Sequence, residues 1–166
     1  LLEQVDADLI KRSVDLIKDK VNLKKNIFIV GNGGSSSIAS HVSVDFVKSA
    51  NIKASTFNNT NLITCFANDY GYEHWVTEAL KSYCDFDDLL ILISSSGKSL
   101  NIVNAAKYCK NNNINLITFS GFKKDNDLCK LGNINFYVDS EDYNFIEMTH
   151  HIILVSIVDI FAKKNL

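Results

Sequence analysis

The sequence predicts an α/β fold in which a parallel β-sheet is covered by helices on both faces. Two observations carry this prediction. Short aliphatic runs recur along the chain without the alternation that is typical of half-exposed strands, and segments with helical spacing separate them. Because crossovers between parallel strands are almost always right-handed, we expect right-handed βαβ units.

Each expected element follows from its local pattern. The first helix, over residues 3–21, places Val5, Leu9, Val14 and Ile17 on one face. Strands are expected at Ile27–Val30, Ala54–Phe57, Leu89–Ile93, Asn115–Phe119 and Ile134–Val138. The other helices are expected at Ser36–Ala50, Asn61–Ala67, His74–Tyr83, Leu100–Asn111, Asp125–Leu131 and Phe145–Ala162, with Asn68-Asp69-Tyr70-Gly71 as a break between the third and fourth helices.

Composition and charge restrict the class of protein. The 166 residues favour one domain over residues 1–166, and a content of 46% apolar and 22% charged residues argues against disorder. The net charge of -2 is spread along the chain, so we expect neither a nucleic-acid partner nor a membrane-binding face. The cysteines form no CxxC pair, which indicates reduced core residues and a cytoplasmic protein: Cys65, Cys84, Cys109 and Cys129.

The last helix is apolar nearly all round, more than a single sheet face requires. Such a helix is either central in the fold or buried in a subunit interface. We therefore expect an oligomer.

Two turns rich in glycine and serine follow expected strands. Gly31-Asn32-Gly33-Gly34-Ser35-Ser36-Ser37 follows the strand at Ile27–Val30, and Ser94-Ser95-Ser96-Gly97-Lys98-Ser99 follows the strand at Leu89–Ile93. Each turn leads into a helix, whose free backbone N–H groups and positive dipole end favour an anion. The two turns therefore predict seats for a phosphorylated small molecule at the carboxyl ends of the strands.

Three other interpretations of the turns are weaker. A dinucleotide site is disfavoured because Ser36 stands at the third small position and no acidic residue closes the strand at Ala54–Phe57. The Walker pattern fails too, because no Gly-Lys-Ser/Thr follows the first turn at the required spacing. A tight connection whose glycines only solve backbone geometry would explain one turn, but the second turn has more hydroxyls than one helix cap uses.

The chain resembles the sugar isomerase (SIS) domain family, and within it the phosphoheptose isomerases, from the first helix to the last. The resemblance rests on Asn32-Gly33-Gly34-Ser35 with His41, on Asn68-Asp69-Tyr70-Gly71, on Ser94–Ser99 and on Glu147–His151. It implies a flavodoxin-like three-layer sandwich with a five-stranded parallel sheet, assembled as a homotetramer with active sites between subunits. It further implies that Ser94, Ser96 and Ser99 hold the phosphate of the substrate. The residues implied to contact the rest of the sugar are Asn32, Gly33, Ser35, Asp69 and Ser95.

The resemblance also implies an acid–base pair one turn apart on the helix after the first turn. The family has a His and a Glu there, and this chain has His41 and Asp45. The spacing of four residues puts both on one helix face, which suits joint ligation of zinc or paired proton transfer. An ordinary polar helix face is the alternative. Aspartate draws the carboxylate back by about 1.5 Å, and a misplacement of ~1 Å costs on the order of 10²-fold in rate.

The last helix departs further from the family. Glu147 stands where the family has Gln, His150 where it has its first His, and Val155 where it has its last. His151 lies one turn beyond Glu147, so these two can act together while His150 points away; His74 is a second candidate replacement.

A bound cation would relieve the repulsion between the carboxylates of Asp45 and Glu147. We therefore predict zinc, held by His41, Asp45, Glu147 and His151, with Asp45, Glu147 and His151 as catalytic residues.

The leading hypothesis from the sequence is an isomerase that converts sedoheptulose 7-phosphate to D-glycero-D-manno-heptose 7-phosphate for surface polysaccharide, either lipopolysaccharide or capsule. The retained hydroxyls and His41 favour it. Val155 favours two alternatives, a partner-binding SIS tetramer and a sugar-phosphate sensor that binds without turnover.

Overall fold

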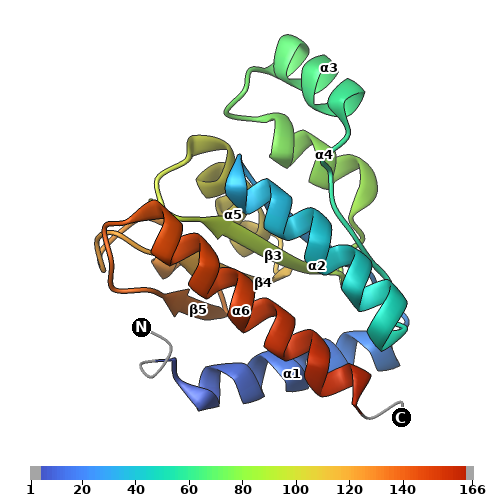
Figure 1. The fold of residues 1–166 in the computed structure, drawn as a ribbon. Coiled ribbons are helices and arrows are strands. Elements are labelled where there is room, and N and C mark those ends of the chain that lie inside the picture. Colours follow the sequence, from blue (N-terminus) through green and yellow to red (C-terminus); the bar gives the residue numbers. More distant parts are fainter. Residues whose placement is uncertain (1–4, 164–166) are drawn as a thin grey trace.

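The computed structural model describes residues 5–163, which form a parallel sheet between two layers of helices (Figure 1). The strands are β1 (Ile27–Gly31), β2 (Ala54–Ser55), β3 (Leu89–Ser94), β4 (Asn115–Ser120) and β5 (Ile134–Tyr137). The helices are α1 (Ala7–Asn22), α2 (Gly34–Ala50), α3 (Thr60–Tyr70), α4 (Trp75–Tyr83), α5 (Leu100–Asn111), the 3-10 turn η2 (Leu128–Lys130) and α6 (Tyr143–Ala162). The five-stranded sheet has the order β2-β1-β3-β4-β5 with all neighbours parallel, which confirms the predicted sandwich.

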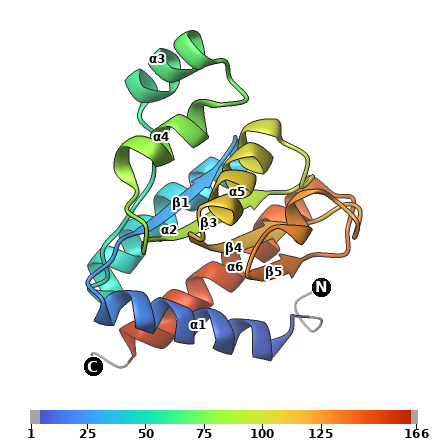
Figure 2. The same ribbon diagram turned by 180° about the vertical axis from the view of Figure 1, so that it is seen from behind.

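Both faces of the sheet are buried, which explains the aliphatic runs without alternation. Along β1, Ile27 and Ile29 face a core built with α1, α2 and α6. Phe28 and Val30 face the opposite core, built with α4 and α5. Figure 2 shows these two helical layers from behind.

Four expectations about local structure need correction. Residues Asn68 to Tyr70 are not a break, because α3 continues to Tyr70 and ends at Gly71, whose φ of 86° suits glycine. The predicted helix Asp125–Leu131 is only a 3-10 turn at Leu128–Lys130, because the Asn126 side chain bonds backbone groups on both sides of it. The strand β2 has only two residues. Of the four cysteines, which are all free, only Cys109 is buried. Residues 3 and 4 of the first expected helix lie outside the described residues.

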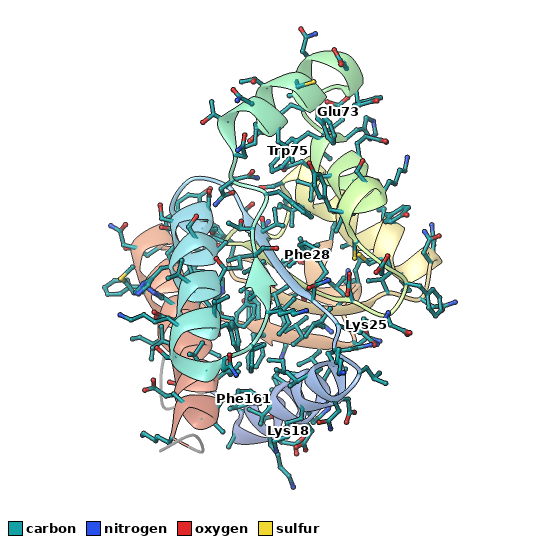
Figure 3. All side chains as sticks on the ribbon, turned by 90° about the vertical axis from the view of Figure 1, so that its right-hand side faces the viewer. Lys18, Lys25, Phe28, Glu73, Trp75 and Phe161 are labelled. Carbon is teal, nitrogen blue, oxygen red and sulfur yellow. The ribbon has the colours of Figure 1, made fainter. Side chains whose placement is uncertain are left out.

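Two features lie at the edges of this core. The helix α3 contributes no buried residue and projects beyond the sheet, with Trp75 at the base of this arm (Figure 3). The helix α6 is long and apolar enough to cross a membrane by length and composition, but it packs in the core against α1 and α2. Its outer face leaves apolar side chains exposed, as an interface helix would: Phe145, Met148, Ile152 and Ile160.

His150 fastens α6 to the end of β4. It is fully buried, its Nε2 lies 3.1 Å from the Ser120 carbonyl oxygen, and its ring meets Phe119 edge-on. Burial lowers the pKa of His150 from 6.5 to about 4, so the imidazole is neutral at neutral pH and donates to Ser120 through Nε2–H. As predicted, His150 faces away from the side of the helix that carries Glu147 and His151.

This burial predicts acid sensitivity. The unfolded chain protonates His150 near pH 6.5 but the folded chain only near pH 4, so stability present above 6.5 is lost as the pH falls through this window. The loss amounts to up to about 3 kcal/mol in the free energy of unfolding. Denaturant titrations of the wild type and His150→Gln from pH 7 to 4.5 measure it. The difference in unfolding free energy between the wild type and His150→Gln should shrink as the pH falls. A difference that stays constant from pH 7 to 4.5 would contradict a neutral, buried His150.

Candidate functional site

The register of the sheet brings the two glycine- and serine-rich turns together. Gly31 at the end of β1 pairs with Ile93 near the end of β3, so both turns leave the same edge of the sheet side by side. A shallow pocket of about 120 Å³ lies between them. Tyr143 and Glu147 of α6 line this pocket, together with Ile93. The rest of the lining consists of residues that the sequence predicts for substrate binding: Asn32, Ser35, Ser94, Ser95, Ser96 and Ser99.

A pair of amides joins the two turns. Asn32 Nδ2 donates to Asn101 Oδ1 and Asn101 Nδ2 donates to Asn32 Oδ1, both at 2.9 Å. The Tyr72 hydroxyl donates to Asn32 Oδ1 at 3.2 Å, which attaches the loop after α3 to the site. Asn101 is buried in the first turn of α5. Sequence reasoning missed it, since one asparagine among the many in this chain gives no signal without its partner.

The second turn, from Ser94 to Ser99, is arranged to receive an anion. Gly97 has a φ of 64°, and a Cβ there would overlap the Asn126 side chain, so the position requires glycine. Ser94 Oγ lies 3.2 Å from Ser99 Oγ, and the Ser99 side chain does not cap α5. The buried hydroxyl of Ser95 has no partner. A ligand that bonds this hydroxyl and the N-terminal amides of α5 would remove the cost of leaving them unpaired.

The start of α2 already faces an anion. A Cβ at Gly34 would overlap the carboxylate of Glu147, so this carboxylate lies directly against the first residue of the helix. The N-terminal end of a helix stabilises a negative charge, and Glu147 supplies one from within the chain. Of the two phosphate seats predicted from the sequence, the one at α2 therefore already has a carboxylate of the chain beside it.

His41, Asp45 and His151 form a hydrogen-bonded row between α2 and α6, which lie side by side in Figure 1. His41 Nε2 lies 3.2 Å from Asp45 Oδ2, and His41 Nδ1 lies 2.9 Å from His151 Nε2. If neutral His41 donates to the carboxylate through Nε2–H, its Nδ1 accepts from His151, and Nδ1 of His151 keeps a free lone pair. Burial is the largest cause that lowers the pKa of His151, and the neighbouring His41 lowers this pKa further. Asp45 acts in the opposite direction.

The donors predicted for zinc do not converge on one point. Within residues 5–163, no three His, Cys, Asp or Glu side chains lie so that they could hold one metal ion. Both ring nitrogens of His41 are occupied by Asp45 and His151. The residues as arranged therefore do not fit a zinc ion. Zinc stays a prediction from the sequence.

Gly33 and the row of His41, Asp45 and His151 are not among the residues that line the pocket, and three others singled out from the sequence also lie away from it. Asp69 is exposed on α3 and accepts a hydrogen bond from its neighbour Asn68 at 2.9 Å. His74 precedes α4 and lies 3.9 Å from Glu73. Val155 packs against the apolar core and offers no proton-transfer group. The role of Asp69 in sugar binding stays a prediction, whereas His151 is the histidine of α6 that meets His41.

Comparison with known proteins identifies the family and the fold. The sequence model of the SIS domain family matches residues 1–121. A phosphoheptose isomerase of Thermodesulfovibrio yellowstonii is 33% identical over 97% of this chain and 87% of its own. The fold superposes on the structure of phosphoheptose isomerase GmhA from Neisseria gonorrhoeae with a TM-score of 0.89, at 20% identity over 98% of this chain and 89% of that one. It also superposes on the Vibrio vulnificus NanR protein complexed with ManNAc-6P, with a TM-score of 0.72, at 17% identity over 98% of this chain and 56% of that one. The chain belongs to the SIS domain family.

Proposed function

We propose that this protein is a sugar-phosphate aldose–ketose isomerase that converts sedoheptulose 7-phosphate to D-glycero-D-manno-heptose 7-phosphate. The observation that carries the proposal is the composition of the pocket, in which serine hydroxyls at the start of α5 face Glu147 of α6. The first is an anion seat and the second a proton-transfer group, and both are needed to isomerise a phosphorylated sugar. The similarity to phosphoheptose isomerases supports the choice of substrate.

The proposed reaction moves two protons through an enediol. His151 takes the proton from C1 of the ketose through Nδ1 and returns it to C2. Glu147 carries the hydroxyl proton from O1 to O2. The reacting carbons lie at the opposite end of the sugar from the phosphate, and His151 stands about 6 Å further along α6 than Glu147, from the helical rise of 1.5 Å per residue.

Asp45 serves this reaction through His41. The bonds from Asp45 to His41 and from His41 to His151 fix the ring orientation of His151 and direct its free nitrogen away from the row. When His151 is protonated, Asp45 offsets the new positive charge. The row thus takes over the task that Val155 cannot perform.

The proposal includes an assembly and a cellular setting. We propose a homotetramer with active sites between subunits, since α6 leaves an apolar outer face and Asp69 lies outside the pocket of its own chain. The enzyme would act in the cytoplasm and supply precursors for surface polysaccharide, without nucleic-acid or membrane partners.

A sugar-phosphate sensor is the second candidate. Val155 in place of the family's last histidine favours binding without turnover, and the NanR protein, which shares the fold, was complexed with a sugar phosphate. A sensor of this kind would need the serine turn to bind its ligand, but it would not need the row of His41, Asp45 and His151.

Turnover separates the two candidates. Sedoheptulose 7-phosphate incubated with the wild type should yield the aldose phosphate, followed by NMR. Ser95→Ala should raise KM roughly tenfold through loss of a hydrogen bond to a charged ligand, with a smaller effect on kcat. Tight binding of the substrate by the wild type without any product would select the sensor.

The row makes a graded prediction. His151→Gln should lower kcat by about 10²- to 10⁴-fold, as expected for loss of a general base. Asp45→Asn should lower it by about 10- to 100-fold, because it loosens the orientation of the base without removing it. Lys110→Gln, at the exposed far end of α5 and away from the outer face of α6, is the control and should keep full activity. Equal activity of wild type and His151→Gln would exclude the proposed base.

The metal content of the protein decides the zinc prediction. The sequence predicts about one zinc per chain in protein purified without an affinity tag, in analogy to the single ion of a catalytic zinc site, whereas the arrangement of the donors in the structure predicts none. A metal-free preparation with full activity would end the zinc prediction and leave the row of His41, Asp45 and His151 to act alone.

A further inference from the structure

Phe122 has a backbone conformation that bulky residues rarely adopt. It follows the end of β4 with a φ of 57°, in the left-handed region. The described residues other than glycine that share this region are Lys24, Asn51 and Asn113, none of them aromatic. A bulky residue remains in this region only where its surroundings hold it, and such residues gather at ligand sites.

Two hydrogen bonds hold Phe122 in place. Its N–H donates to the Ser140 carbonyl oxygen at 2.8 Å, and its carbonyl oxygen accepts from the Tyr137 hydroxyl at 2.8 Å. The segment is therefore tied at both ends of one residue, which sets the direction of the Phe122 side chain.

The Phe122 ring supports Tyr143. The two rings meet in a T-shaped contact with centroids 4.8 Å apart and planes at 63°, a favourable geometry for aromatic pairs. Tyr143 is the first residue of α6 and lies one turn before Glu147, on the same side of the helix. It lines the pocket with the serines although its side chain is 57% exposed. An exposed aromatic ring is thus fixed at the pocket by a strained neighbour.

We propose that Tyr143 is a substrate-binding residue for the sugar chain, and that Phe122 is its positioning residue. The inference rests on the function proposed above. The anion seat lies at Ser94–Ser99, so a ring beside Glu147 meets the polyhydroxylated carbon chain and not the phosphate. The ring face packs against C–H groups of the sugar, and the phenol hydroxyl can donate to or accept from a sugar hydroxyl.

The ligand pair for the test is sedoheptulose 7-phosphate and inorganic phosphate, with each Kd measured by calorimetry. Tyr143→Ala should raise the Kd of the sugar phosphate roughly tenfold, and leave the Kd of inorganic phosphate within about twofold. Tyr143→Phe should show a smaller loss, since it keeps the ring. In turnover, Tyr143→Ala should change KM more than kcat.

Phe122→Gly tests the positioning role. Glycine accepts the positive φ without strain, so we expect Phe122→Gly to lower the melting temperature less than other truncations of Phe122 would. The aromatic support of Tyr143 is lost in this variant. The Kd of the sugar phosphate should rise as much as in Tyr143→Ala. The double variant Phe122→Gly/Tyr143→Ala should bind the sugar phosphate with the same Kd as Tyr143→Ala alone. Phe86→Ala is the matched control, because Phe86 is an exposed aromatic residue before β3 that lies outside both the pocket lining and the outer face of α6.

Three results would overturn the inference. The first is a Kd for the sugar phosphate that Tyr143→Ala leaves within about twofold of the wild type, which is the effect we expect of the control. The second is an equal loss of affinity for both ligands, which would show a structural role. The third is wild-type protein that binds inorganic phosphate but no sugar phosphate, which would refute the proposed function as well. In the first two cases the proposed function is still supported if the wild type turns over sedoheptulose 7-phosphate, and only the roles of Tyr143 and Phe122 are refuted.

Discussion

The mutual amide pair of Asn32 and Asn101 is the contact on which the site depends. Its two hydrogen bonds of 2.9 Å tie the turn after β1 to the helix that follows the serine turn. The parallel register of β1 and β3 brings the turns to the same edge of the sheet, but it does not fix the position of one turn relative to the other. The amide pair sets their relative position, and with it the distance between the serine hydroxyls and the residues of α2.

Charge then divides the site between two helix starts. Both α2 and α5 begin at the pocket, and both would attract an anion. The Glu147 carboxylate lies against Gly34, so α2 is matched by a charge of the protein itself. In the proposed function, this leaves the start of α5 for the phosphate and directs the reacting end of the sugar toward α6. Glu147 would then act on the orientation of the substrate as well as on proton transfer.

Much of this could be predicted from the sequence, because it depends on local patterns. The strands β1, β3, β4 and β5 follow from runs rich in aliphatic residues, and the two turns follow from glycine and serine at the strand ends. The spacing of four residues between Glu147 and His151 likewise predicts a shared helix face, and the contact of His151 with His41 agrees with it.

The rest depends on contacts between distant segments, for which one sequence carries no signal. Asn101 and Tyr143 look like ordinary residues of helix starts until the fold pairs Asn101 with Asn32 and places Tyr143 in the pocket lining. The strained backbone of Phe122 has no local signature either, since glycine or asparagine would be expected there. The sequence pattern predicts a break between helices at Asp69, but α3 continues through it to Tyr70 and ends at Gly71.

The location of the phosphate tests the account most directly. A crystal structure with sedoheptulose 7-phosphate should show the phosphate on the Ser95 hydroxyl and the first amides of α5, with the Glu147 carboxylate still against Gly34. A phosphate bound instead at the start of α2, with Glu147 displaced, would contradict the division of charge from which the orientation of the substrate and the roles of the α6 residues follow.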